Sequence, residues 1–222
     1  KLETNSNTQN SQIQNSLEFR NSNLEFADSA LVLNLIDTPG HVDFSYEVER
    51  TLACVEAAIL LVDATQGIQA QTIAHTYKAL EQNLHIIPVV NKIDAPHAEV
   101  EKTVAALSEF LGIDGKSIHK ISAKTGEGIA QLLESLADTV PAPENNKVFD
   151  DVASDDKTRA LIFDSYYDSY RGVIAFVRVF TGSLKKGDSV YLHASDSTFT
   201  IDEVGIFTPD LMPQDKLTEG EI

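Results

Sequence analysis

The stretch Leu31-Val-Leu-Asn-Leu-Ile-Asp37-Thr-Pro-Gly40-His41-Val-Asp43-Phe44 decides how the rest of the chain is interpreted. Its first six residues are Leu, Val and Ile except for Asn34, and they lack polar alternation, which predicts a strand buried on both faces, as in a parallel sheet. The run ends at a carboxylate and a Thr-Pro-Gly turn, and helical patterning follows. In open α/β sheets, ligands bind just beyond the carboxyl ends of such strands. We therefore expect Asp37, Gly40 and His41 to lie where the chemistry takes place.

Composition and charge limit the class of protein. The chain has 222 residues, enough for one large domain or two modest ones. No apolar run approaches the roughly 18 residues of a membrane span, and no signal segment opens the sequence. The single cysteine, Cys54, excludes an internal disulfide framework and makes cytosolic residence the default. A net charge of −17 argues against an extended nucleic-acid groove, and we expect no DNA partner.

Three changes of pattern divide the chain into four segments. Residues 1–23 are rich in Asn, Ser and Gln, a composition that stays flexible or forms a loose hairpin, and we interpret them as a poorly ordered insertion. From 24 to 140, strand and helix patterns alternate. A linker is expected at 141–158, because two prolines end the last helix and a polar acidic stretch follows. From 159 to 222 only strand patterns occur.

The alternating segment predicts βαβ units and a mainly parallel sheet. The expected strands are 31–36, 57–62, 85–90 and 118–121, and the expected helices are about 44–55, 70–83, 97–111 and 128–140. Pro88 lies inside one of these strands, where proline normally indicates an edge position. The last segment predicts a small antiparallel barrel, with strands at 159–164, 173–180, 189–193 and 198–206 and no closing strand after them.

Polar groups follow three of the expected parallel strands. They occupy 37–41, Asn91 to Asp94 and Ser122 to Lys124. Taken singly, each has an ordinary alternative as a helix cap or a polar turn. Their shared position at strand ends makes one common site the better hypothesis. Three further polar residues are interpreted as structural, namely Glu56, Asp63 and His75.

The order of these three motifs resembles the third, fourth and fifth signature boxes of the GTPase superfamily, and 37–44 has the form seen in translational GTPases. Three stretches resemble the elongation factor 4 (LepA) family, namely HVDFSYEV at 41–48, VDATQGIQAQT at 62–72 and GIFTP at 205–209. Residues 172–188 resemble the barrel of translation factors. The resemblance covers about 31–222 and implies a P-loop GTPase-like α/β domain at 24–140 followed by an all-β barrel.

The fourth and fifth boxes have the groups that guanine recognition needs. The carboxylate of Asp94 can accept hydrogen bonds from guanine N1 and N2, whereas adenine would leave it unpaired. Asn91 can bond the other edge of the base, and the stem of Lys92 can cover its face. By resemblance, the backbone amide of Ala123 meets guanine O6, and Lys124 lies against the base beside Ser122.

The third box carries the expected hydrolytic groups. The resemblance implies that Asp37 holds Mg²⁺ through a water. Gly40 lets its backbone N–H approach the γ-phosphate without a side chain in the way. His41 would orient the attacking water, and without the resemblance it would be an exposed loop histidine. A segment that γ-phosphate orders and hydrolysis releases is a switch, expected at about 37–48.

No Gly-x-x-x-x-Gly-Lys-Ser/Thr motif and no first-switch threonine occur in the sequence. We therefore expect a chain that begins within the GTPase domain, stops inside the barrel and is catalytically incomplete alone. For the full-length protein, the resemblance implies ribosome-associated hydrolysis of GTP to GDP during protein synthesis, in the cytoplasm or peripherally at the membrane's cytoplasmic face. The alternatives are a non-catalytic ribosome-docking module and a piece of another factor, such as elongation factor G or a TypA-like protein.

Overall fold

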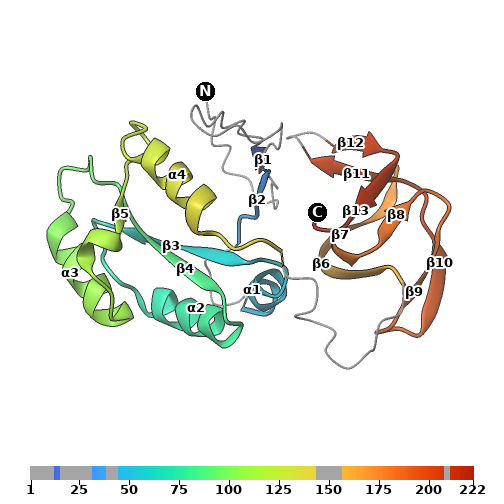
Figure 1. Ribbon diagram of the computed structural model, residues 1–222, viewed down its shortest axis with the longest axis horizontal. Helices are drawn as coiled ribbons and strands as arrows, with labels where there is room; N and C mark the ends of the chain where they lie inside the picture. The colour runs from blue at the N-terminus through green and yellow to red at the C-terminus, as the bar shows by residue number, and fades with distance from the viewer. Residues whose placement is uncertain (1–12, 16–31, 39–44, 144–156, 208–210) are drawn as a thin grey trace. The chain divides into compact units, whose positions relative to one another are not determined.

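The computed structural model describes residues 13–15, 32–38, 45–143, 157–207 and 211–222. The chain divides into two compact units. One unit spans Gly40–Glu144, and the other combines Lys1–Pro39 with Asn145–Ile222. Each unit has its own elements and its own core (Figure 1). None of the helices in the described part of the chain has the length and apolar character needed to cross a membrane.

The first unit is built on a parallel sheet of three strands in the order β3-β4-β5. The strands are β3 (Ala57–Asp63), β4 (His85–Asn91) and β5 (His119–Lys120). The helices between and around them are α1 (Ser45–Leu52), α2 (Ala70–Glu81), α3 (Val100–Leu111) and α4 (Ile129–Thr139). A one-turn 3₁₀ helix, η2 (Gly115–Ser117), precedes β5. The predicted α/β fold with a parallel sheet is confirmed.

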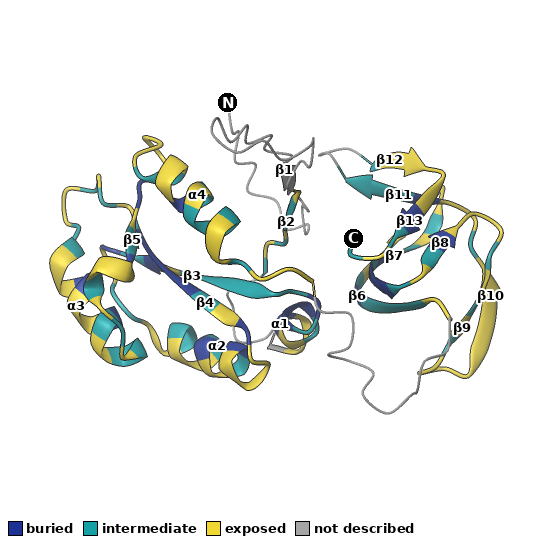
Figure 2. Cartoon of the chain, viewed as in Figure 1, coloured by how far each residue is buried: buried dark blue, intermediate teal, exposed yellow. Residues whose placement is uncertain are grey.

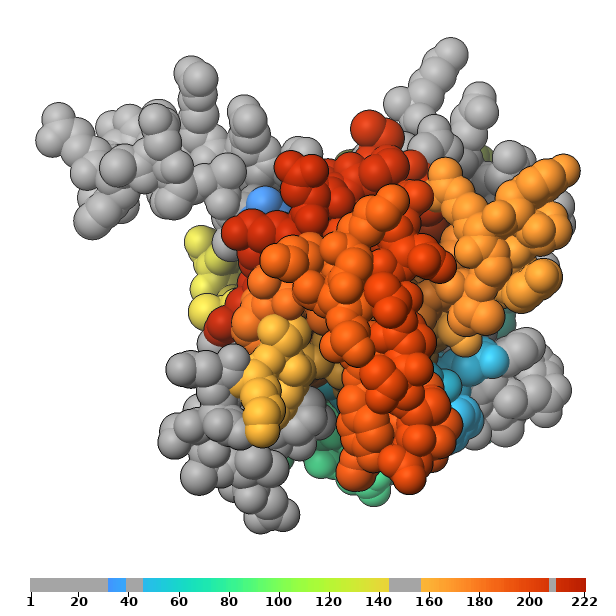
Figure 3. Space-filling model, turned by 90° about the vertical axis from the view of Figure 1, so that its right-hand side faces the viewer, coloured from blue at the N-terminus to red at the C-terminus, as the bar shows by residue number. Residues whose placement is uncertain are grey.

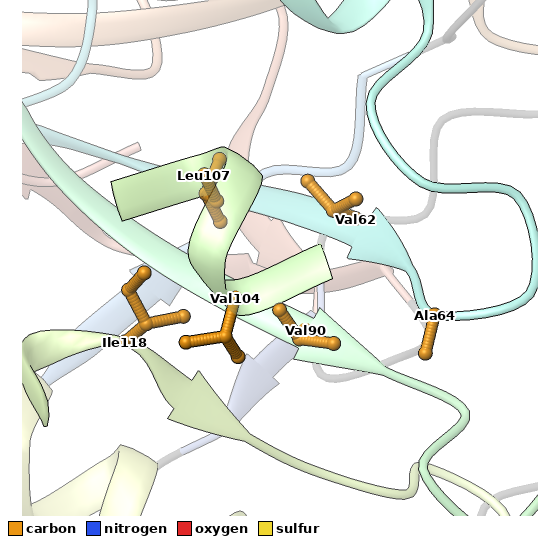
Figure 4. Packing of buried hydrophobic residues seen from close by; sticks show 6 residues of the cluster. All are labelled: Val62, Ala64, Val90, Val104, Leu107 and Ile118. Atoms are coloured by element: carbon orange, nitrogen blue, oxygen red, sulfur yellow. The ribbon is translucent and has the colours of Figure 1, made fainter. Parts of the chain in front are cut away.

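Side chains alternate between the two faces of this sheet, as strand geometry requires. On one face, the even-numbered positions of β3 and β4 pack against α1, α2 and α3. Six residues form the cluster under α3, namely Val62, Ala64, Val90, Val104, Leu107 and Ile118 (Figure 4). On the other face, Ile87 and Val89 pack against Leu132 of α4. Helices on both faces fix the strand register, and with it the positions of the strand ends.

The middle strand β4 contains Pro88, so the edge position that proline normally indicates is wrong here. Pro88 lies opposite Leu60 of β3 in the register. On the other side, β5 pairs only with Val89 and Val90. Pro88 therefore lies in a part of β4 that has a single neighbouring strand, which is how a residue without an N–H donor is accommodated.

The strand predicted at 31–36 does not belong to this parallel sheet, and its predicted burial on both faces is wrong. The observed strand, β2 (Leu33–Leu35), pairs antiparallel with β1 (Ile13–Asn15). Val32 is 53% exposed and Leu35 47% exposed. An apolar run this short is compatible with either pairing, because the pairing depends on a partner 20 residues away in sequence. The segment 1–23 supplies that partner.

The second unit contains only strands after residue 157 among its described residues, which confirms the all-β prediction. Its strands are β6 (Arg159–Asp168), β7 (Gly172–Thr181), β8 (Ser183–Lys185), β9 (Ser189–Leu192), β10 (Ser197–Thr200), β11 (Val204–Phe207), β12 (Leu211–Gln214) and β13 (Lys216–Thr218). All their pairings are antiparallel. Val179, Leu184, Val204 and Leu217 form a buried cluster. Figure 2 shows the buried parts of the strands in dark blue. The β9–β10 hairpin is visible on the face in Figure 3, and every residue of β10 is exposed.

Two details of this unit differ from the sequence prediction. The strand expected at 198–206 is two strands, β10 and β11, separated by three residues without strand pairing. Two further strands, β12 and β13, follow the last predicted one, and β13 pairs with β8. The end of the chain is also tied to β7, since Val179 N donates to Glu221 O and Gly220 N donates to Val179 O.

Candidate functional site

The carboxyl end of the parallel sheet brings two of the three predicted motifs together. Asp63 at the end of β3 lies opposite Asn91 at the end of β4. Beyond β4, Ile121 N donates to Val90 O, and Ile93 N donates to Ile121 O. The segments 91–94 and 122–127 therefore run side by side at one edge of the sheet. This juxtaposition follows from the parallel register, because parallel strands end at the same edge.

The side chain of Asn91 holds these two segments to each other. Its Oδ1 accepts a hydrogen bond from Lys92 N at 2.7 Å and another from Ala123 N at 3.1 Å. The second bond spans 32 positions in sequence. The backbone amide expected to meet guanine O6 is thus already aligned by Asn91. A ligand oxygen at this amide would have to share or replace that bond.

Asp94 is joined to the same neighbouring segment through Ser122. The Ser122 hydroxyl donates to Asp94 Oδ1 at 2.6 Å, and Ser122 Oγ in turn accepts from Thr125 N at 3.1 Å. Ser122 is fully buried, whereas Asp94 is exposed. The bond from Ser122 holds the pKa of Asp94 below its usual value, aided by the charge of Lys124 and opposed by partial burial. Asp94 is consequently an ionised, accessible acceptor at neutral pH.

Lys92 has an unusual backbone conformation and a defined partner. Its φ is 63°, in the left-handed region that residues with a side chain seldom adopt. Its Nζ lies 2.7 Å from Asp63 Oδ2. Burial by itself would raise the pKa of Asp63, but the hydrogen bonds from Lys92 and Thr65 and the lysine charge outweigh it and lower the pKa to about 2. The turn after β4 is therefore tied to the end of β3 as well.

Asp63, which the sequence analysis interprets as structural, lies at the same edge of the sheet as Asn91. It occupies the last position of β3, just as Asn91 occupies the last position of β4. The sequence already shows that both residues directly follow the apolar run of a predicted strand. Asp37 is exposed and follows β2, while Gly40 and His41 lie outside the described residues. Lys124 is exposed, next to Ala123 in the same turn.

A parallel sheet covered by helices, with Asn-Lys-Ile-Asp and Ser-Ala-Lys turns joined at its carboxyl edge, defines an α/β domain of the GTP-binding class. Residues 3–142 match the family model of the elongation factor Tu GTP binding domain, and the chain belongs to that family. Residues 157–210 match elongation factor G domain 2.

Individual relatives agree with this assignment. Elongation factor 4 of Gloeothece citriformis is 53% identical over 191 residues, which are 86% of this chain and 30% of the relative. Elongation factor 4 of Thermotoga maritima is 48% identical over 190 residues, which are likewise 86% of this chain and 30% of the relative. The resemblance to the elongation factor 4 family is thus confirmed, and the chain spans about 30% of the length of these relatives.

A solved structure shows the same fold at lower identity. Translation elongation factor SelB from Methanococcus maripaludis, in complex with the GTP analogue GppNHp, has a TM-score of 0.67 and 21% identity. The likeness covers 88% of this chain and 43% of the SelB chain.

Proposed function

We propose that this chain is part of a ribosome-associated translational GTPase of the elongation factor 4 type, with its guanine-base site in the turns 91–94 and 122–125. The observation that carries the proposal is the pair of hydrogen bonds that lock these turns together, Ala123 N to Asn91 and Ser122 to Asp94. A site whose donors and acceptors are fixed before the ligand arrives loses less entropy on binding.

Base selection rests on Asp94. Its ionised carboxylate accepts hydrogen bonds from guanine N1–H and N2–H, and adenine has no such pair of donors. Asn91 binds the N7 edge, the amide of Ala123 donates to O6, and the stems of Lys92 and Lys124 cover the faces of the base. Ser122 acts on the base through Asp94, because its hydroxyl fixes the carboxylate.

Hydrolysis rests on the segment 37–41, by likeness to the family. The exposed carboxylate of Asp37 is the hard oxygen ligand that Mg²⁺ prefers, and it would hold the ion through a water. Bound Mg²⁺ neutralises phosphate charge during the transfer. Gly40 donates its N–H towards the γ-phosphate, and His41 orients the attacking water. The full-length protein would hydrolyse GTP to GDP on the ribosome in the cytoplasm, with peripheral membrane association as a further property and no DNA partner.

Asp94→Asn tests the base site directly. We expect the variant to lose preference for guanosine diphosphate and to gain preference for xanthosine diphosphate, whose O2 accepts where guanine N2 donates. The ratio of the two dissociation constants should change by about 100-fold or more, since a site built to bond a ligand donor strongly rejects an analogue without it. The 222-residue chain is titrated with each nucleotide up to millimolar nucleotide concentration, and the shifts of its amide NMR signals measure binding.

The matched control is Asp114→Asn, because Asp114 is an exposed aspartate of the same unit that accepts from Lys116 N in its own turn. It should leave the ratio unchanged. Two results would overturn the proposed site: unchanged guanine preference in Asp94→Asn, or no guanosine-dependent shifts at 91–94 and 122–125 in the unaltered chain.

A further inference from the structure

The backbone of Lys92 suggests that something other than local preference fixes this turn. Among the described non-glycine residues, positive φ occurs at Asn83, Lys92 and Asp196. Asparagine and aspartate tolerate this region because their short side chains bond locally, whereas lysine has no such compensation. Such conformations persist where the surroundings determine them, and they cluster at functional sites.

Two contacts hold Lys92 in place, one at each end of the residue. The backbone N–H donates to Asn91 Oδ1, and the ammonium pairs with Asp63 Oδ2 at 2.7 Å. Asp63 lies opposite Asn91 in the sheet register. The ion pair therefore crosses from the end of one strand to the turn after the next, and the lysine stem spans the gap between them.

Asp63 is itself fixed independently of the lysine. Its Oδ1 accepts from Thr65 N at 2.8 Å and from Thr65 Oγ1 at 2.7 Å, and its Oδ2 accepts from Gln66 Nε2 at 3.2 Å. These bonds lie within the turn that follows β3. A carboxylate with its orientation set in this way is a preorganised partner for the ammonium.

The carboxylate of this pair is less exposed than the carboxylates of the other lysine pairs described in this unit, including Glu49 of the Lys78–Glu49 pair, which is 52% exposed. In the Lys102–Glu99 pair the side chains are 77% and 62% exposed, and in the Lys120–Glu101 pair they are 40% and 83% exposed. Pairs of that kind contribute little, because water competes for both charges. The side chain of Asp63 is only 19% exposed, so its bond to Lys92 is better shielded.

We infer that Asp63 is a positioning residue for the guanine-base site: it anchors the ammonium of Lys92 so that the lysine stem forms a fixed wall against one face of the base. This inference rests on the proposed function. Without the anchor, the four-carbon stem would sample several rotamers, and binding would have to order it. Asp63 makes no contact with the base in this arrangement.

The test is a double-substitution cycle on affinity for guanosine diphosphate in the 222-residue chain. Asp63→Asn removes the negative charge that anchors the ammonium, and Lys92→Met keeps an apolar stem but removes the anchored charge. Each should weaken binding by about five- to tenfold, in the range of measured coupling between contacting residues. The doubly substituted chain should bind no more weakly than either single variant. A merely structural role of Asp63 would instead give additive losses.

Glu99→Gln is the matched control, because it neutralises the carboxylate of another lysine pair of the same unit, Lys102–Glu99, without touching Asp63 or Lys92. It should retain affinity within about twofold of the unaltered chain. Amide spectra of every variant verify that the fold is intact. If the unaltered chain binds the nucleotide but Asp63→Asn binds equally well, or if the losses add, the positioning role is refuted and the base site stands. If the unaltered chain does not bind, the proposed function itself fails.

Discussion

Asp94 and Asp168 have similar carboxylates and dissimilar surroundings. Asp168, in the β6–β7 hairpin, accepts from Tyr170 N and Arg171 N, both at 2.8 Å. Asp94 accepts from a serine 28 positions away. Both have a pKa below the usual value, Asp168 through the backbone bonds from Arg171 and Tyr170 and Asp94 through Ser122. The first carboxylate closes its own turn, whereas the second joins two loops.

The same contrast separates individual side chains elsewhere, and the β unit has long-range bonds as well, such as Thr158 Oγ1 to Ser183 O. In the β unit, Asp188 Oδ2 accepts from Lys185 N and Tyr191 OH donates to Asp196, three and five positions apart. At the carboxyl edge of the parallel sheet, Asn91 reaches Ala123 across 32 positions. A polar group with local partners is typical of a turn. A polar group that holds distant segments together is a better candidate for a ligand site, since only tertiary structure creates its geometry.

The largest expected effect concerns Gly128, where the segment 122–127 returns to β5. A Cβ at Gly128 would overlap the backbone oxygen of Lys120, and φ is 76°. Gly128→Ala should therefore destabilise the chain by about 4 kcal/mol or more in urea unfolding. Gly187 closes the local β8–β9 turn with φ of 88° and open space around it. Gly187→Ala should cost only about 1–2 kcal/mol. Equal losses would contradict the idea that the close approach of Gly128 to Lys120 is more demanding than the open turn at Gly187.

An intermediate effect is expected from Ser122→Ala. Removing this fully buried hydroxyl leaves Thr125 N without its acceptor, at a cost of about 1–3 kcal/mol. The pKa of Asp94 should rise towards the ordinary value, because its main depressing bond is lost.

The sign of the pH dependence follows from that depressed pKa. In the unaltered chain, ionised Asp94 contributes stability above the ordinary aspartate pKa of about 3.9, and this is lost as the pH falls through the lower folded value. The stability difference between the unaltered chain and Ser122→Ala should therefore be larger at pH 7 than in acid. Carbon-13 titration of the carboxyl groups measures the pKa. An unchanged titration of Asp94 would reject the coupling.

The smallest effect is expected from Asp168→Asn. The amide oxygen of asparagine can still accept from Tyr170 N and Arg171 N, so only the charge is lost from an exposed turn. The urea midpoint should stay close to that of the unaltered chain, and guanosine diphosphate should bind equally well. Weakened nucleotide binding in this variant would remove the distinction between the two aspartates.

Much of the α/β unit could be predicted from the sequence. Strands 57–62 and 85–90 are long apolar runs, and helix α2 begins at Ala70 as expected. What failed depends on distant partners. The pairing of β2 is set by β1, and β12 and β13 are short, partly polar strands whose existence depends on β11 and β8. The position of Asp63 beside Asn91 appears only when β3 and β4 lie in register.

The sole cysteine gives the α/β unit a built-in reporter of its own opening. Cys54 follows α1 and is 0% exposed. A thiol reagent reaches such a group only when the surrounding structure opens, so the rate of modification measures how often that happens. The same burial means that a second cysteine introduced on the surface would react first. The chain can therefore be labelled at one chosen position without removing the native thiol.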